Sequence, residues 1–303
     1  MPARIAHLNC MSFCPPGRRL MDGRRGAKGP AMLSCHCLLI ELGDRLVLVD
    51  TGYGVQDVRH PRARLSPLFL DVLCRPRLYE QATALRQIEK LGYRAEDVSD
   101  IVLTHLDFDH AGGLDDFPRA RVHMLATEKA AAMAQRTWLD RARFRPVQWK
   151  SSLERWRTYS PAGERWFGFE AARGLEGLPP EILLVPLIGH THGHAGVAIR
   201  RESGTWMLHT GDAYFYRGEM DVGRPHCTPG LRFYQWFMEV DREKRLMNQH
   251  RLRELVRSHG REVHVFCAHD IVELERMKRI SATAPVTANE RGIVQPHLRP
   301  GVA

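Results

Sequence analysis

The sequence of 303 residues lacks any apolar run near the roughly 18 residues that a membrane-spanning helix requires. Its first twelve residues lack a basic end followed by a long apolar stretch, so we expect no secretory signal and a cytoplasmic location. No solenoid-type repeat occurs, and no Gly-x-Ser-x-Gly elbow supplies a serine nucleophile. These absences favour a globular protein that does not use a serine-hydrolase mechanism.

Cysteine is scarce and odd in number. Seven cysteines in a chain of this length exclude a small disulfide scaffold. Cys35 and Cys37 would share one face of a strand and could be soft metal ligands. However, no second cysteine or histidine pair accompanies them at zinc-finger spacing. We therefore expect reduced thiols that pack as small apolar groups.

Composition places the chain among ordinary globular proteins, with 44% apolar and 26% charged residues. The formal charge of +9 comes mainly from arginines spread along the chain. A basic surface can attract nucleic acid or anionic substrates. Because no nucleic-acid-binding motif accompanies the charge, we expect a solvated surface and a small-molecule substrate, with a homodimer as an open alternative.

Patterning divides the chain into an arm, a core domain and a tail. Residues 1–30 are rich in Gly, Pro and Arg and predict an irregular arm, and 281–303 predict a tail. Strand patterns within 31–280 cover 38–40, 46–49, 101–103, 121–125, 182–185, 197–200, 205–208 and 263–266. Helical patterns cover 81–91, 127–135, 241–259 and 271–280. Strands followed by helices, twice over, suggest two packed sheets with helices outside.

Residues 136–180 interrupt this rhythm. Four of the six tryptophans lie here among arginines: Trp138, Trp149, Trp156 and Trp166. The segment predicts either an inserted helical pair that packs its own aromatic side chains, or a lid that walls a substrate pocket. Both interpretations stay open at this point.

The densest chemical signal is the run His105-x-Asp107-x-Asp109-His110, directly after an apolar strand. Alternate residues of an extended segment point the same way, so His105, Asp107 and Asp109 can converge where the strand opens into a loop. Burying this much charge is costly unless the side chains coordinate cations. The run therefore predicts a metal site.

Three later strands each end in a further candidate ligand. His190 lies in Gly-His-Thr-His-Gly-His, Asp212 in Thr-Gly-Asp-Ala and His269 in Ala-His-Asp. Four strands that deliver ligands from terminal loops predict one site at one edge of the sheets. The loop of His190 also holds His192 and His194, and we expect His194 to be structural.

Together with Leu48-Val49-Asp50-Thr51-Gly52, these motifs resemble the metallo-β-lactamase-fold superfamily, and within it the lactonase-like hydrolases, over about residues 33–275. Each motif alone is weak, but five in this order are specific. The resemblance implies a four-layer αββα sandwich and two divalent metal ions, in the first place zinc, that activate water against a small ester such as a lactone. A glyoxalase II-like thioesterase, a β-lactam hydrolase and a non-catalytic metal- or ligand-binding protein are the alternatives.

The resemblance also implies a role for each residue. The first metal would bind His105, Asp107 and His190, the second would bind Asp109, His110 and His269, and Asp212 would bridge both. Asp50 would orient a ligand histidine. Asp109 would in addition be catalytic, accepting or returning a proton.

Asp107 departs from the family pattern, which has histidine at this place. A third carboxylate brings the summed charge of two divalent ions, one hydroxide and the ligands to about zero instead of about +1. The extra negative charge should weaken the Lewis acidity of the first metal, and a hard oxygen ligand favours iron or manganese. Asp107 also agrees with a centre that keeps one tight and one labile metal.

A second departure follows the bridging residue. Lactonase-like relatives often place a tyrosine three positions after it, where the hydroxyl can bind the reacting carbonyl, but this chain has Phe215 there. Tyr214 and Tyr216 flank that position and would point to the opposite face of a strand. We take Tyr214 as the second candidate catalytic residue.

Overall fold

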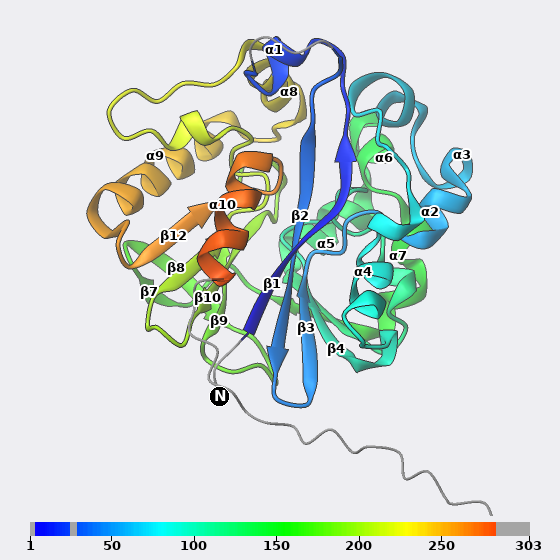
Figure 1. Cartoon of the computed structure of the whole chain (residues 1–303), viewed down its shortest axis with the longest axis horizontal. Helices are drawn as coiled ribbons and strands as arrows, with labels where there is room; N and C mark the ends of the chain where they lie inside the picture. Colours follow the sequence, from blue (N-terminus) through cyan, green and yellow to red (C-terminus); the bar gives the residue numbers. More distant parts are fainter. Residues whose placement is uncertain (1–3, 25–28, 283–303) are drawn as a thin grey trace, which may run out of the picture.

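The computed structural model describes residues 4–24 and 29–282 (Figure 1). Two six-stranded sheets pack face to face, and helices cover their outer surfaces. The strand orders are β1-β2-β3-β4-β5-β6 and β12-β11-β10-β9-β8-β7. The predicted α/β class and four-layer αββα sandwich are confirmed.

The first sheet contains β1 (Arg4–Phe13), β2 (Leu33–Leu42), β3 (Arg45–Val49), β4 (Val98–Val102), β5 (Arg121–Leu125) and β6 (Trp156–Tyr159). Strands β1 to β3 form an antiparallel meander, and β3 to β6 are parallel. Because parallel strands end at the same edge, the residues after β3 and β4 meet there.

The second sheet contains β7 (Glu164–Trp166), β8 (Phe169–Gly174), β9 (Ile182–Pro186), β10 (Ala195–Arg200), β11 (Trp206–His209) and β12 (Val263–Phe266). Strand β10 is antiparallel to both β9 and β11, and β11 is parallel to β12. Strands β9, β11 and β12 therefore run in one direction and end at a common edge.

The longer helices are α4 (Ala84–Lys90), α5 (Ala126–Ala134), α6 (Trp138–Arg143), α8 (Pro229–Met238), α9 (Arg242–His259) and α10 (Ile271–Ala282). Short α-helical turns are α1 (Arg18–Met21), α2 (Val55–Arg59), α3 (Pro61–Arg64) and α7 (Pro146–Trp149). A π-helical turn, η1, spans Leu68–Leu73. The 3₁₀ turns are η2 (Glu80–Ala82), η3 (Ala95–Asp97), η4 (Leu114–Asp116), η5 (Lys150–Arg155) and η6 (Arg217–Met220).

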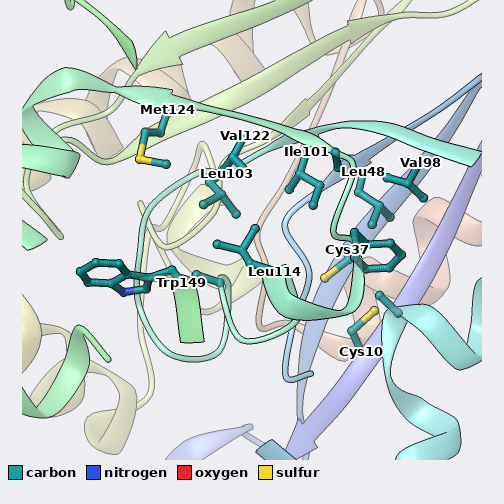
Figure 2. Packing of buried hydrophobic residues seen from close by; sticks show 14 of the residues in the cluster. Cys10, Cys37, Leu48, Val98, Ile101, Leu103, Leu114, Val122, Met124 and Trp149 are labelled. Carbon is teal, nitrogen blue, oxygen red and sulfur yellow. The ribbon is translucent and has the colours of Figure 1, made fainter. Parts of the chain in front are cut away.

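Four apolar clusters make up the core of the described residues, and three of them are layers that hold the strand ends in place. Between the sheets, side chains such as Val47 and Val102 face Leu184 and Val197. Outside the first sheet, Leu48, Ile101 and Trp149 belong to one fully buried cluster (Figure 2). A third cluster lies between the second sheet and α9. Such close packing resists displacement, so loops that leave these strands start from fixed positions.

Residues 1–30 are not an irregular arm throughout, as the sequence had predicted. The ten-residue strand β1 pairs with β2, with an irregularity between Asn9 and Ser12. Most of its side chains are buried, Cys10 and Met11 among them. The flanking Gly, Pro and Arg residues obscure the strand pattern of β1 in the sequence. Pairing with the long apolar strand β2 stabilises β1. At the other end, helix α10 continues to Ala282, and the remaining tail lies outside the described residues.

The segment 136–180 is not a helical pair throughout. Its first half forms α6, α7 and η5, but its second half forms β6, β7 and β8, which extend both sheets. Trp149, Trp156 and Trp166 are buried in this scaffold, whereas Trp138 is exposed. Trp156 and Trp166 lie in the edge strands of the two sheets, which do not share the apolar pattern of the central strands.

Within the described ranges, no helix has both the length and the apolar character needed to cross a membrane. The cytoplasmic location stays a prediction. All seven cysteines are free thiols, and six of them are buried.

Candidate metal centre

The site lies where β3, β4, β9, β11 and β12 end. Backbone hydrogen bonds tie these ends together: Ala195 N–H donates to the Thr104 carbonyl, and Ala268 N–H donates to the Gly211 carbonyl. The strand ends thereby bring all seven predicted ligands together, each less than one-tenth exposed: His105, Asp107, Asp109, His110, His190, Asp212 and His269.

Four of these residues form a first group around one point. His190 Nε2 lies 3.1 Å from Asp107 Oδ2 and 3.3 Å from Asp212 Oδ2. His105 Nε2 lies 3.4 Å from Asp107 Oδ2. Ligand atoms at these separations can surround one ion at about 2.0–2.2 Å.

The second group lies around the other oxygen of Asp212. Asp212 Oδ1 is 3.2 Å from His110 Nε2 and 3.0 Å from His269 Nε2. Asp109 Oδ2 is 3.3 Å from His110 Nε2 and 3.5 Å from His269 Nε2. Because one carboxylate presents an oxygen to each group, Asp212 has the geometry of a bridging ligand.

The donor atoms fit metal ions because several of them have no hydrogen-bond partner. His105 Nε2, His110 Nε2, Asp109 Oδ2 and Asp212 Oδ1 are buried without one, and all belong to the two groups. Polar atoms buried in this way are costly unless something binds them. Divalent cations would satisfy all four at once.

The carboxylates and imidazoles shift each other's protonation. Burial alone would raise the pKa of Asp212, but His269 and His110 hold it well below its usual range. Burial alone would lower the pKa of His110, but Asp109, Asp212 and Asp50 raise it well above its usual range. Burial, followed by the neighbouring Arg143 guanidinium, lowers the pKa of His190 to about 4. His190 is therefore neutral near pH 7, the form in which an imidazole binds metal, whereas His110 would release a proton when a metal ion binds.

Asp50 holds the ligand loop from behind. Its carboxylate lies 2.8 Å from His110 Nδ1 and accepts hydrogen bonds from the N–H and the hydroxyl of Thr104, both at 2.8 Å. Asp50 is in the left-handed region at φ 55°, and so is Gly52 at φ 64°. A Cβ at Gly52 would collide with Cys10, so only glycine fits there. This tight turn places Asp50 where it fixes the ring of His110.

The other predicted histidines occupy different positions. His194 Nδ1 lies 3.0 Å from the carbonyl of Leu187, and its Nε2 accepts the Asp212 N–H at 2.8 Å. These contacts link two ligand loops. His192 is exposed.

The structure does not bring Tyr214 together with the seven ligands. Its hydroxyl lies 3.0 and 3.2 Å from the two carboxylate oxygens of Glu273, and its ring belongs to the apolar layer under α9. This position gives a catalytic role for Tyr214 no support. Phe215 instead stacks on His269 with ring centroids 4.9 Å apart.

An aromatic wall that the sequence did not reveal covers the second group. The ring centroid of Phe13 lies 5.2 Å from that of His269, and the ring centroid of Tyr53 lies 5.9 Å from that of Phe13. Tyr234 lies on α8, a helix that the sequence pattern did not predict, and its ring centroid is 5.5 Å from that of Phe215. The Tyr53 hydroxyl is buried with no hydrogen-bond partner. A hydroxyl of this kind can bind a polar group of a substrate.

Two further residues lie beside the predicted ligands: Arg143, for which the sequence carried no signal, and Cys35, which the sequence offered as a possible soft metal ligand. Arg143, at the end of α6, contacts Asp107 and His190. Cys35 Sγ lies within 4.8 Å of ligand atoms of Asp109 and His269. Burial, followed by the nearby Asp109 carboxylate, raises the pKa of Cys35 well above its usual range. Cys35 thus packs as a neutral thiol beside the second group, while Cys37 packs in the layer outside the first sheet.

A family model for the metallo-beta-lactamase superfamily matches residues 31–250. A probable metallo-hydrolase of Mycobacterium tuberculosis is 42% identical over 270 residues, which cover 89% of this chain and 81% of that protein. An N-acyl homoserine lactonase of Bacillus thuringiensis is 24% identical over 273 residues, which cover 88% and 95%.

A solved structure of an N-acyl homoserine lactone hydrolase has the same fold. It matches with a TM-score of 0.64 at 21% identity, covering 91% of this chain and 97% of that one. Its product, N-hexanoyl-L-homoserine, is bound at the catalytic metal centre of that protein. The length of the family match and the closeness of the mycobacterial relative agree with the convergence of the seven ligands. The chain therefore belongs to the metallo-beta-lactamase superfamily and is a metal-dependent hydrolase.

Proposed function

We propose that this hydrolase opens small carboxylic esters, above all lactones, with two divalent metal ions, in the first place zinc. The observation that carries the proposal is the convergence of seven buried ligand residues on two neighbouring points that share Asp212. The lactonase of Bacillus thuringiensis, related over most of its length, supports the substrate class. Four imidazole ligands suit zinc, although Asp107 leaves iron and manganese as alternatives.

Metal ions bound by these residues would polarise an ester carbonyl and lower the pKa of water towards 7. Asp109 directs Oδ2 at the second group, and its other carboxylate oxygen can take the proton that water loses when the water oxygen bonds to the carbonyl carbon. When the ring C–O bond breaks, the same carboxyl can return that proton to the leaving oxygen. A lactone yields a single hydroxy acid, and an open-chain ester yields one carboxylic acid and one alcohol.

The aromatic wall would hold the rest of the substrate. Phe13, Phe215 and Tyr234 present ring surface beside His269, which suits an acyl chain. Tyr53 offers its unpartnered hydroxyl to a carbonyl or amide oxygen. A cavity of about 10 Å³ lies beside His269 and Phe215 and has room for about one water molecule. Entry of an ester at this point therefore requires side chains of the wall to move.

A substrate panel tests the proposal. The metal-restored protein is assayed with lactones, aryl esters, thioesters and β-lactams, and products are identified by mass. We expect the highest kcat/KM for a lactone with an acyl substituent. A higher value for a thioester or a β-lactam would establish one of the alternative hydrolases, and tight binding without turnover would establish a binding protein.

Substitution of Tyr214 and of Tyr53 tests which of the two hydroxyls acts on the substrate. We expect Tyr214→Phe to keep kcat/KM within about twofold of the wild-type value, because its hydroxyl faces Glu273. The loss of that buried contact should lower the free energy of unfolding by about 1–3 kcal/mol. Tyr53→Phe, the comparison variant, should lower kcat/KM by about tenfold or more. A tenfold loss in Tyr214→Phe would show that this hydroxyl acts on the substrate after all.

A further inference from the structure

Arg143 is a fully buried arginine that forms a fork on Asp107. Its Nε donates to Asp107 Oδ1 at 2.7 Å, and its Nη2 donates to Asp107 Oδ2 at 2.6 Å. The side chains of both residues are at most 2% exposed. An isolated antiparallel bridge between Asp107 and Phe144 brings the end of α6 to this place. The pair is therefore held by backbone as well as by charge.

The same guanidinium also reaches a second member of the first group. Arg143 Nη2 lies 2.8 Å from His190 Nε2, which also lies 3.1 Å from Asp107 Oδ2. Because arginine can only donate, His190 Nε2 accepts from Arg143 in the tautomer that carries its proton on Nδ1, the form in which Nε2 could also bind a metal ion. An imidazole nitrogen has a single lone pair, which a metal ion would also need. On its far side, Nη1 donates to the carbonyl of Met238 at 2.7 Å. These contacts fix the guanidinium where it competes with a metal ion for the lone pair of His190.

The second group has different neighbours. Asp109 has the imidazoles of His110 and His269 within 3.5 Å, and both are potential ligands. His110 and His269 are oriented from behind by Asp50 and by the Ser34 carbonyl. These partners leave the Nε2 lone pairs directed into the site, because the hydrogen bonds occupy Nδ1.

We propose that Arg143 makes the two metal positions unequal. The position at His105, Asp107 and His190 binds a divalent ion weakly, because a permanent cation neutralises Asp107 and competes for His190. The position at Asp109, His110 and His269 binds tightly. The Asp107–Arg143 pair also restores the summed charge that a neutral histidine would give, so the lower Lewis acidity expected from Asp107 alone is offset. This inference rests on the metal dependence of the proposed function but not on its substrate.

The test is a metal titration without substrate. Full-length protein stripped with a chelator is titrated with Zn²⁺ against a competing chromophoric chelator. We expect two steps whose Kd values differ by about 100-fold or more, or a single step if the weak one lies out of range. Arg143→Gln should tighten the weak step by about tenfold or more and leave the tight step unchanged. Asp109→Ala should remove the tight step.

A matched variant controls for the loss of a buried arginine. Arg64 donates to the buried carboxylate of Asp57 at 2.7 Å, away from the ligands, so Arg64→Gln should titrate as the wild type does. Two wild-type steps of equal affinity would overturn the proposal, as would a weaker second step in Arg143→Gln. If Arg143→Gln does not fold, the wild-type titration alone decides. If the protein binds two metal ions with unequal affinity but does not hydrolyse lactones, only the proposed substrate is contradicted.

Discussion

Replacement of Asp212 by alanine is expected to lower kcat/KM by at least about 10³-fold, or about 4 kcal/mol of transition-state stabilisation. Its Oδ1 faces His110 and His269, and its Oδ2 faces His190 and also lies 3.2 Å from His269 Nε2. A single substitution would therefore remove a ligand from both proposed metal positions. The measurements are kcat/KM for the best substrate of the panel and metal content by elemental analysis.

Asp100 provides the control for this prediction. It is a buried carboxylate of β4 that pairs with Arg121 at 2.8 Å and with His123 at 2.9 Å, outside the ligand groups. Asp100→Asn should reduce stability and leave metal content unchanged. If Asp212→Ala kept its metal and its activity, Asp212 would not be a ligand.

Asp50→Asn is expected to weaken metal binding at the second position by about 10- to 100-fold. The carboxylate accepts two hydrogen bonds from Thr104 and orients His110 through Nδ1, and an amide cannot accept all three. Asparagine is the appropriate substitution because it tolerates the left-handed backbone of this position, whereas alanine would add strain.

The effect of Asp50→Asn is measured by competition with a chelator, as for Arg143. Raising the metal concentration should recover most of kcat, because Asp50 does not contact the substrate. An unchanged Kd for the tight step would contradict the assigned role. A loss of activity that saturating metal does not reverse would instead indicate a misfolded loop.

The sequence predicted the strands that carry the site because each is a short apolar run. Most side chains of β3, β4, β9 and β12 are buried, so these strands consist mainly of apolar residues. Polar residues in the sequence mark where each strand ends. The seven predicted ligands follow the ends of β4, β9, β11 and β12, which is why they could be chosen from the chain alone. Their pairwise convergence then follows from the parallel strand directions.

Elements that depend on partners far along the chain could not be predicted in the same way. Strand β1 follows no clear alternation and is stabilised by β2, and β6 to β8 carry tryptophans that suggested an insertion. Arg143 comes from α6 and Tyr234 from α8, more than thirty and more than one hundred positions after Asp107. No local signal links these residues to the ligand loop.

Tyr214 shows how a one-residue difference in position changes what a side chain contacts. The sequence could place Tyr214 beside the bridging residue, but it could not show which side of the loop faces the ligands. Burial of Phe215 against His269 turns Tyr214 towards Glu273. Packing of the larger aromatic cluster therefore decides which ring reaches the site.

Anomalous diffraction from crystals of the protein as purified tests the central claim most directly. Data collected across the absorption edge of the metal found by elemental analysis identify its position and its element. We expect a strong peak within about 2.5 Å of His110 Nε2, Asp109 Oδ2 and Asp212, with a weaker peak near His105 and His190. Metal-containing crystals with no peak among these residues would contradict the account.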